Sequence, residues 1–411
     1  MTTPRTSFRT FYFLALGKFI SEIGTYLDTV VFSLYVYQLS SSAIATGSFL
    51  ALRLFGSVFA GFYAGVLADR LNRKRLMVVA DCARALALLV LLLTPTTSHL
   101  NILYVIGFTL GIFNVLFDVS LRAAIPTILG NKQRVRANAI INSSIALAVV
   151  IGCLFSGLLA DTLGYRITFL IDMATYLFSA IIIGSLKLHT NEKKASSSSS
   201  IRSFVNDVRL SYTALKALPI LFAMIILRLL DAFGSGSQNI ATPIFSQALY
   251  PEKPALAMGI IMATWGIGKF SASPLLRRYL ERSDSRIEPT YAIAIFTMSA
   301  SFVALFFSHT LPFILFFAAT AGAADGASEI CLDSRLQEIP DKTRGKVFGA
   351  SYTFQMLGWG VGLYLCAPFF QWFSIGYVLL LFHILPIAAC CAFAALLVVG
   401  HKKQAKVAQN K

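Results

Sequence analysis

The feature that most constrains this chain is a succession of long apolar runs joined by short polar connections. Twelve runs contain about 20 mostly apolar residues each, which is the length an α-helix needs to cross a bilayer. They lie at 11–37, 44–68, 76–93, 101–123, 137–160, 166–187, 217–246, 255–276, 290–308, 311–334, 346–370 and 375–399. The runs predict an all-α integral membrane protein whose consecutive helices are antiparallel neighbours, because a backbone in lipid must satisfy its own hydrogen bonds.

Composition favours the same environment. Hydrophobic residues make up 56% of the 411 and charged residues only 13%, about half the ~25% typical of soluble domains. The net charge of +16 could indicate a nucleic-acid partner. We expect none, because the bases form short clusters between apolar runs and make no basic face. Lys18 and Glu22 interrupt the N-terminal run and no cleavage site follows, so we expect a retained helix rather than a signal peptide.

Lys and Arg are distributed unevenly between the two sides of the predicted membrane. With the N-terminus in the cytoplasm, 28 of the 35 fall on the cytoplasmic side, and only Arg166 and Lys253 fall on the other. This bias is the positive-inside pattern. We therefore expect a multi-pass protein of the inner (cytoplasmic) membrane, with both termini in the cytoplasm.

One long connection divides the chain into two halves. Its serine run is typical of a flexible linker, and "IRSFVNDVRLSYTALK" predicts an amphipathic helix on the membrane surface. The predicted parts are an N-terminal six-helix bundle (1–187), a cytoplasmic linker (188–216), a C-terminal six-helix bundle (217–400) and a cytoplasmic tail (401–411).

The two halves show weak internal similarity. At an offset of 210 residues Lys18 meets Arg228 and Gly24 meets Gly234, and "SLRAAIP" in the first half has an echo in "DSRLQEIP" in the second. Two echoes in corresponding places predict parallel repeats of six helices, the arrangement of one class of secondary transporters.

The stretch "GVLADRLNRKR", residues 65–75, resembles the signature of the major facilitator superfamily between its second and third spans. Asn72 stands where the signature usually has Gly, but Asn also tolerates a left-handed backbone. "LRAAIPTIL" and "GYRITFLIDMATYLFSA" resemble the drug:proton antiporter-3 group, which includes macrolide and siderophore exporters. The resemblance implies the major facilitator fold, with twelve transmembrane helices in two pseudo-symmetric six-helix bundles.

The resemblance also implies a conformational gate at this motif. Asp69 would face the start of the eleventh span, and Arg73 would reach an acid at the inner end of the fourth span, most simply Asp118. The gate candidates are Gly65, Asp69, Arg70, Arg73, Asp118 and Arg122. We place Asp81 and Arg84 in a structural charge network near the same ends of the spans. The fifth span, "IGCLFSGLL", lacks the proline usual in drug antiporters, which leaves antiport and export direction open.

Ionisable residues inside the spans are the main candidates for the site, because a charge in lipid costs at least ~2.5–3.5 kcal/mol unless it meets a partner or water. In the first span, Lys18 and Glu22 are spaced to neutralise each other, whereas Asp28 lacks a local base. In the seventh span, Arg228 and Asp231 are also neighbours. The "GSGSQN" that follows predicts a weakened or broken helix beside the substrate.

The tenth span carries Asp325, Glu329 and Asp333 on one face. Three uncompensated carboxylates would repel one another, so we expect bound protons or bases from other helices. Asp325 is nearest mid-membrane and, with Asp28, is the predicted proton site. We expect Asp333 to pair with Arg335 or a loop base, and Lys269 to be a counter-ion of an acid in the seventh or tenth span, to attract an anionic substrate, or to extend to the interface.

The predicted function is secondary active transport by alternating access, with proton-coupled export of amphiphilic organic solutes (drug- or siderophore-like). The proton and substrate cavity candidates are Glu22, Asp28, Arg228, Asp231, Gln238, Lys269, Asp325 and Glu329, and the weaker ones are Lys18, Tyr35, Arg53, Asp172 and Trp265. The alternatives are import of a small solute or metal chelate, lysophospholipid flipping, and a non-transporting sensor.

No motif indicates an enzyme, a cofactor or a metal site. The sequence shows no nucleotide-binding glycine loop, no His-rich motif and no Ser-His-Asp arrangement, and its six cysteines lie inside apolar runs. The expected partners are a small-molecule substrate, protons and the lipid bilayer, and we expect a monomer.

Overall fold

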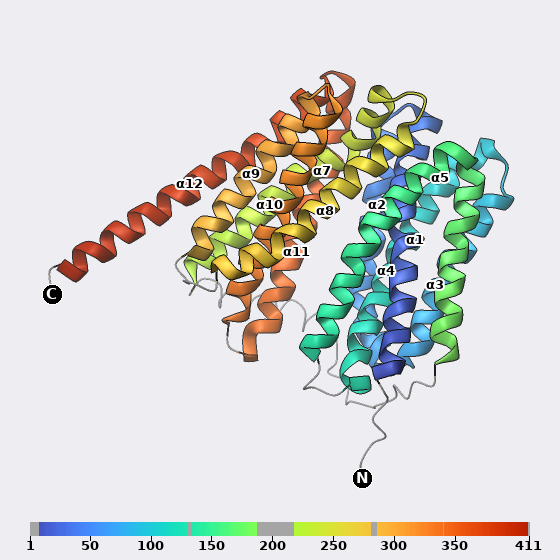
Figure 1. Ribbon diagram of the computed structural model, residues 1–411, viewed down its shortest axis with the longest axis horizontal. Coiled ribbons are helices and arrows are strands. Elements are labelled where there is room, and N and C mark those ends of the chain that lie inside the picture. Colours follow the sequence, from blue (N-terminus) through green and yellow to red (C-terminus); the bar gives the residue numbers. More distant parts are fainter. Residues whose placement is uncertain (1–7, 130–133, 187–217, 281–285, 340, 410–411) are drawn as a thin grey trace, which may run out of the picture. The chain divides into compact units, whose positions relative to one another are not determined.

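The computed structural model describes the chain except for residues 1–7, 130–133, 187–217, 281–285, 340 and 410–411, and no strand occurs in the part that it describes (Figure 1). The first half contains α1 (Phe8–Ser40), α2 (Ala43–Arg70), α3 (Arg73–Leu93), η1 (Thr96–Ser98), α4 (His99–Leu129) and α5 (Arg134–Ser185). The second half contains α7 (Pro219–Leu249), α8 (Pro254–Leu280), α9 (Ile287–Phe307), α10 (Leu311–Gln337), α11 (Asp341–Cys366), η4 (Ala367–Gln371) and α12 (Ile375–Gln409). The predicted all-α class is confirmed.

Within the described residues, nine helical stretches are long and apolar enough to cross a membrane. One of them, Ile140–Ser185, covers two of the predicted spans, so the nine account for ten. The described parts of α8 and α11 are not among the nine.

Gly164 separates the two spans that α5 contains. Its φ of 79° lies in the left-handed region, where a side chain would be strained, so glycine allows the chain to reverse there. The predicted runs 137–160 and 166–187 lie on either side of this residue.

Asn72 has a different structural reason from the one expected. Its φ is −67°, an extended conformation open to any residue, and its side chain accepts a hydrogen bond from the backbone N–H of Arg75 at 3.2 Å. Asn72 is therefore the N-cap of α3 rather than a substitute for a left-handed glycine.

The chain divides into two compact units. Unit 1 comprises residues 1–198 and 246–263, and unit 2 comprises residues 199–245 and 264–411. The end of α7 and the first turns of α8 thus pack with the first half of the chain. The Asp161 carboxylate supports this packing, because it accepts hydrogen bonds from the backbone N–H groups of Ala255 (3.3 Å) and Leu256 (2.6 Å) at the start of α8. The predicted surface helix at 201–216 lies outside the described residues.

A close helix crossing recurs in both units. In unit 1, α2 crosses α4 so tightly that a Cβ on Gly111 would overlap the carbonyl oxygen of Arg53. In unit 2, α8 crosses α10 in the same way, with Gly322 against the carbonyl oxygen of Trp265. The corresponding residues are 211 and 212 positions apart, close to the offset seen in the sequence. Small residues allow such backbone contact between membrane helices.

The expected break in the seventh span is wrong. α7 is continuous from Pro219 to Leu249, through the whole of "GSGSQN". A Cβ on Gly236 would lie 2.6 Å from the carbonyl carbon of Gly362, so α7 and α11 meet backbone to backbone. The glycines serve helix packing, which overrides their low helix propensity.

Candidate functional site

The buried polar residues of α1 that include Lys18, Ser21, Thr25 and Asp28 form a polar stripe, which begins with an ion cluster at Lys18. Lys18 forms an ion pair with Glu22, and its Nζ also lies 2.6 Å from Oδ1 of Asp118 in α4. Lys18 is 1% exposed and Glu22 7%. The spacing predicted the pair on α1, but Asp118 adds a contact from another helix.

Arg84 of α3 continues this cluster along the stripe. It forms an ion pair with Asp81 and donates to Ser21 Oγ at 3.1 Å, while Ser21 donates to Asp81 at 3.0 Å. The Arg84 guanidinium also lies 4.5 Å from the centre of the Tyr176 ring. Asp81 and Arg84 therefore adjoin the candidate site rather than forming a separate network.

Asp28 lies farther along α1 and, as predicted, has no base near it on that helix, but a neighbouring helix supplies one. Arg53 of α2 lies 2.6 Å from Asp28 Oδ1, and the Tyr176 hydroxyl donates to Oδ2 at 2.7 Å. The base comes from a neighbouring helix, so the spacing within α1 could not reveal it. Asp28 is 1% exposed, and its two carboxylate oxygens contact residues of α2 and α5.

Asp172, in the second span of α5, is the exception in unit 1. It is completely buried, and neither carboxylate oxygen has a hydrogen-bond partner among the described residues. A Cβ on Gly24 of α1 would lie 2.8 Å from Asp172 Oδ1, so glycine makes room for the acid. The charges of Asp28, Arg53 and Arg84 act on it. The two buried acids thus share two neighbouring bases, of which Arg84 already forms an ion pair with Asp81.

In unit 2, two bases converge on one acid. Asp325 of α10 lies 3.3 Å from Arg228 of α7 and 2.9 Å from Lys269 of α8. Arg228 also contacts Asp231 at 3.1 Å and donates to Ser328 Oγ at 3.1 Å. Asp325 joins three helices through charge-assisted contacts.

Lys269 is a counter-ion of α10 acids, which is one of the arrangements expected for it. Besides Asp325, it reaches Glu329 at 2.9 Å, and its Nζ lies 5.4 Å from the Trp265 ring. Its side chain is 34% exposed and that of Glu329 50%. This part of the cluster is therefore open, whereas Arg228 and Asp231 are buried.

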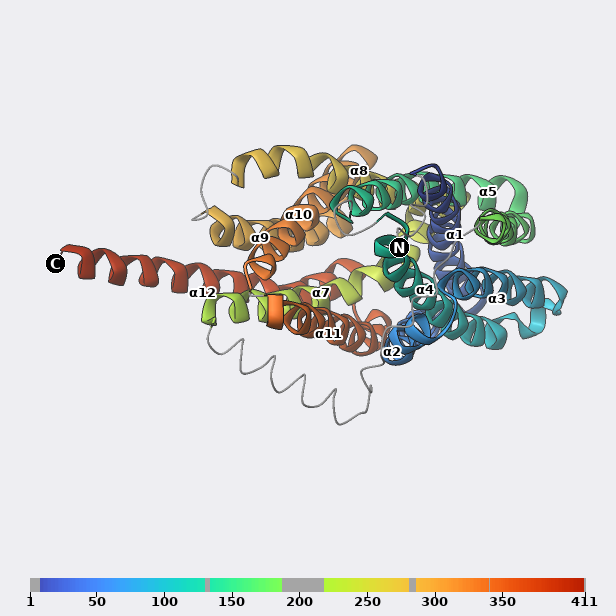
Figure 2. The same ribbon diagram turned by 90° about the horizontal axis from the view of Figure 1, so that it is seen from below.

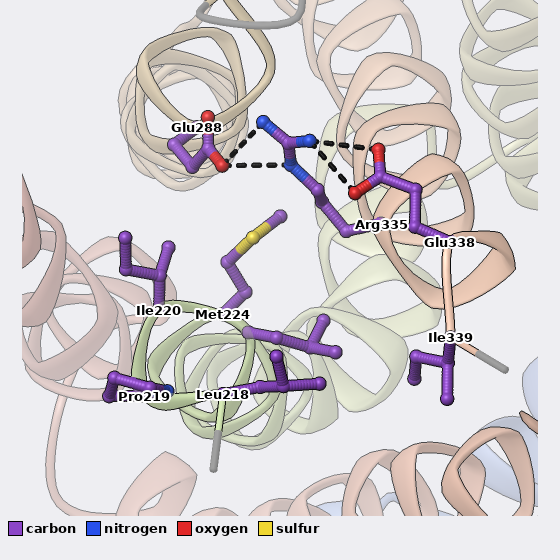
Figure 3. A pocket seen from close by; sticks show the side chains of 9 residues that line it. Leu218, Pro219, Ile220, Met224, Glu288, Arg335, Glu338 and Ile339 are labelled. Carbon is purple, nitrogen blue, oxygen red and sulfur yellow. Dashed lines mark hydrogen bonds and ion pairs between the residues drawn. The ribbon is translucent and has the colours of Figure 1, made fainter. Parts of the chain in front are cut away.

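Of the two partners predicted for Asp333, the bases of the connection after α10 lie outside the described side chains, and Arg335 contacts two glutamates. Arg335 Nη2 lies 2.7 Å from Glu288 of α9, and Nη1 lies 2.8 Å from Glu338 (Figure 3). These groups border a cavity of about 470 Å³, opposite the apolar start of α7. Its lining residues are Leu218, Pro219, Ile220, Leu221, Met224, Glu288, Arg335, Glu338 and Ile339. Arg335 contacts Glu288 of α9 and Glu338 at the end of α10. The bases whose charges act on Asp333 are Arg228 and Lys269.

Within the described part of the chain, two further candidates, Tyr35 and Gln238, form no hydrogen bond or ion pair with these ion clusters. Tyr35 lies 2.7 Å from His99 Nδ1 and its ring is 4.6 Å from that of Tyr165. Gln238 is half-buried and its Oε1 has no hydrogen-bond partner among the described residues.

The family follows from comparison with known proteins. The sequence model of the family described as the Major Facilitator Superfamily matches residues 14–224 of this chain. The chain belongs to the Major Facilitator Superfamily.

Members of the Major Facilitator Superfamily resemble the chain in sequence and in structure. The uncharacterized MFS-type transporter YjbB of Bacillus subtilis (strain 168) is 25% identical over 346 residues, 82% of this chain and 83% of that protein. The enterobactin exporter EntS of Escherichia coli is 31% identical over 153 residues, 36% of each chain. The nucleoside transporter NupG (D323A mutant) matches 94% of this chain and 99% of its own, with a TM-score of 0.77 and 14% identity. The predicted major facilitator fold is confirmed. The prediction that the chain is a transporter and not an enzyme is also confirmed by its family.

The superfamily motif of residues 65–75 has different contacts from those expected. Arg73 donates to the carbonyl oxygens of Ala68 (3.1 Å) and Ala123 (2.8 Å), while Asp118 binds Lys18. Gly65 has open space around it, Arg70 and Arg122 are exposed, and the Asp69 side chain lies outside the described part. A gate at this motif stays a prediction.

Sequence reasoning missed two buried aromatic side chains. Tyr176 bridges Arg84 and Asp28 from α5, and His383 of α12 is completely buried with no partner for either ring nitrogen among the described residues. The signal that could have found His383 is the repeat offset, since it lies 211 residues after Asp172.

Proposed function

We propose that this chain is a proton-coupled transporter that exports amphiphilic organic solutes from the cytoplasm by alternating access. We place it in the inner membrane with both termini in the cytoplasm, as the distribution of Lys and Arg favours. Proton coupling is proposed from the balance of acids and bases inside the helices. The export direction and the substrate class are proposed from the sequence resemblance to known exporters.

The observation that carries the proposal is an excess of acids over bases in the two ion clusters, whose members are buried or half-buried except for the exposed Glu329. In the described part of unit 1, three bases face five acids: Lys18, Arg53 and Arg84 against Glu22, Asp28, Asp81, Asp118 and Asp172. In that of unit 2, two bases face four acids: Arg228 and Lys269 against Asp231, Asp325, Glu329 and Asp333. Each group carries two excess negative charges when fully ionised, and bound protons would neutralise them at low cost.

Within unit 1 we assign the coupling proton to Asp28 and Asp172 together. Arg53 can compensate one of these carboxylates, and it already contacts Asp28 at 2.6 Å. The other carboxylate is then an uncompensated buried charge unless it holds a proton. Asp28 and Asp325, the acids predicted from the sequence, are both paired with bases, so Asp172 becomes the main candidate.

A proton drives transport only if it binds the two conformations differently. In this arrangement, the carboxylate pair would release its proton when Arg53 moves within reach of both acids, and would take it up when Arg53 contacts only Asp28. One conformation then carries the substrate and the other carries the proton, so the two move across the membrane in opposite directions. No nucleotide hydrolysis is needed, in keeping with the lack of a phosphate-binding loop in the sequence.

Sequence resemblance supports the export of drug- or siderophore-like solutes. The partial match to the enterobactin exporter is the most similar in identity of the relatives described above, although it covers 36% of this chain. The motifs of the first half also resemble the drug:proton antiporter-3 group. The likeness to NupG, at 14% identity, bears on the fold alone.

The experiment uses inside-out membrane vesicles containing the protein, with an imposed pH gradient that is acidic inside. The probes are ethidium, a macrolide and a catecholate siderophore, each offered outside the vesicles. We expect at least one probe to accumulate, and accumulation to collapse when a protonophore dissipates the gradient. Accumulation only in intact cells would instead show import and contradict the proposed direction.

Matched variants connect the flux to the buried acids. Asp28→Asn removes a carboxylate that is 1% exposed, whereas Glu252→Gln removes an exposed one in the α7–α8 connection. We expect gradient-driven accumulation to be lost in Asp28→Asn and retained in Glu252→Gln. Equal activity of both variants and the native protein would remove Asp28 from the coupling pair.

A further inference from the structure

We propose that His383 is a second proton-binding site, and that it occupies in unit 2 the position that Asp172 occupies in unit 1. The inference deepens the proposed proton coupling and rests on it. It concerns a residue on α12, outside both of the ion clusters described above.

The equivalence of the two positions comes from their contacts with the first helix of each half. A Cβ on Gly24 of α1 would lie 2.8 Å from Asp172 Oδ1, and a Cβ on Gly234 of α7 would lie 3.0 Å from His383 Nδ1. The two glycines are 210 residues apart, and the two ionisable residues are 211 apart. These offsets agree with the 211 and 212 of the recurring helix crossing, so the same place in each repeat holds an ionisable side chain against a glycine.

The two side chains also share an unusual state. Asp172 and His383 are both 0% exposed, and none of their side-chain oxygen or nitrogen atoms has a hydrogen-bond partner among the described residues. Buried polar side chains are normally hydrogen-bonded, so each exception calls for an explanation. What the two side chains have in common is that a carboxylate and an imidazole both bind protons, and a side chain without hydrogen-bond partners is free to gain or lose one when its surroundings change.

Among the described residues, no charged group acts on the His383 ring in this conformation. The ring faces Gly234 of α7 and lies 5.9 Å from the Phe302 ring of α9. On α7, the acid closest in sequence to Gly234 is Asp231, one turn earlier. Its Oδ2 contacts Arg228, but its Oδ1 has no hydrogen-bond partner among the described residues. Asp231 is therefore the acid best placed to receive a protonated His383 after a small movement of α7.

Pro386 supplies a reason for movement at this place. Proline has no N–H, so the helical hydrogen bond to the carbonyl of Phe382 is missing from α12, one residue before His383. That carbonyl oxygen lies 3.3 Å from the Cβ position of Gly234, and so it points at α7. A missing bond in the helix ladder is a common cause of kinks, and here it coincides with the buried imidazole.

The direction of the effect follows from linkage. A proton on His383 in the conformation seen here would place an uncompensated charge inside the bundle, which is costly. Proton binding therefore belongs to a second conformation, in which α7 and α12 separate at Gly234 and the imidazolium meets Asp231 or water. Acidification favours that conformation, because the proton binds it more tightly.

The test reads proton binding directly by NMR of the full-length protein in detergent, labelled with 13C at the histidine Cε1. The chain has five histidines, and the His383 signal is the one that disappears in His383→Gln. We expect this signal to shift as the pH falls from about 8 to 5, the range in which histidine titrates. A signal that keeps the position of neutral imidazole throughout that range overturns the inference and identifies His383 as a structural side chain.

Two further variants separate this site from the rest of the protein. Asp231→Asn should move the midpoint of the His383 titration to lower pH by removing the acid that receives the imidazolium, and an unchanged midpoint would contradict that role. His309→Gln removes an exposed histidine between α9 and α10 and should leave the His383 signal unchanged. If His383→Gln does not fold, His383→Asn serves for the assignment. The readout does not use flux, so its failure would leave the Asp28 and Asp172 proposal intact.

Discussion

Units 1 and 2 share a helical scaffold but differ in how charge is arranged on it. In unit 1, Lys18 and Arg84 both lie 5.3 Å from the centre of the Phe117 ring, and Arg84 leads through Tyr176 to Asp28, so the charges form a chain. In unit 2, the bases converge on Asp325, so the charges form a hub. The glycine crossings, by contrast, recur at nearly the same offset. The comparison teaches that the repeat preserves where helices meet, while the chemistry at those places has diverged.

This difference predicts that the stability of unit 2 depends mainly on one base, Arg228. Arg228→Met would leave Asp231 without its base and Asp325 with Lys269 alone, so we expect a loss of about 3–5 kcal/mol in stability. Lys269→Met should cost only ~1 kcal/mol, because its side chain is one-third exposed. Melting temperatures of the detergent-purified variants check this order, and equal losses would contradict the dominant role of Arg228.

A tyrosine in each unit sharpens the comparison. The Tyr176 hydroxyl donates to the Asp28 carboxylate, whereas the Tyr291 hydroxyl of α9 donates to the backbone carbonyl of Met224 at 2.9 Å. A hydrogen bond to a charged group is the stronger, so Tyr176→Phe should cost roughly 1.5–3 kcal/mol and Tyr291→Phe ~1 kcal/mol. The same melting experiment applies. A larger loss from Tyr291→Phe would argue that Asp28 carries no charge in the folded protein.

The shared scaffold makes a prediction in which the units should not differ. Gly111→Ala and Gly322→Ala each push a methyl group into a backbone carbonyl of the facing helix, so both should lose about 1–3 kcal/mol. Gly349→Ala is the control, because nothing lies within 4 Å of the Cβ position there. A loss at only one of the two crossings would break the proposed equivalence of the repeats.

The sequence predicted the helices and the local ion pairs because both depend on short-range regularities. Apolar runs of membrane-spanning length located the spans, and spacings of three or four residues brought Lys18 to Glu22 and Arg228 to Asp231. The counter-ion role of Lys269 was also among the expected arrangements, because an isolated base in a span needs an acid.

The remaining contacts depend on packing that the spacing does not encode. Asp28 meets Arg53 and Tyr176 only because α1 packs between α2 and α5, and Tyr176 is 148 residues away along the chain. The glycine run of α7 was misread for a related reason, since glycine favours both helix breaks and close helix contact, and the neighbouring α11 decides between them. Figure 2, seen from below, shows how the helices of each unit gather side by side.

The central claim, that the Asp28 and Asp172 pair holds the coupling proton, is tested most directly by Asp172→Asn in proteoliposomes. The substrate is a probe that accumulates in the inside-out vesicles. Asparagine imitates the protonated acid, so we expect accumulation driven by a pH gradient to fall by about tenfold or more while substrate exchange without a gradient persists. Accumulation at the native level in Asp172→Asn, with the gradient verified in the same liposomes, would contradict the account.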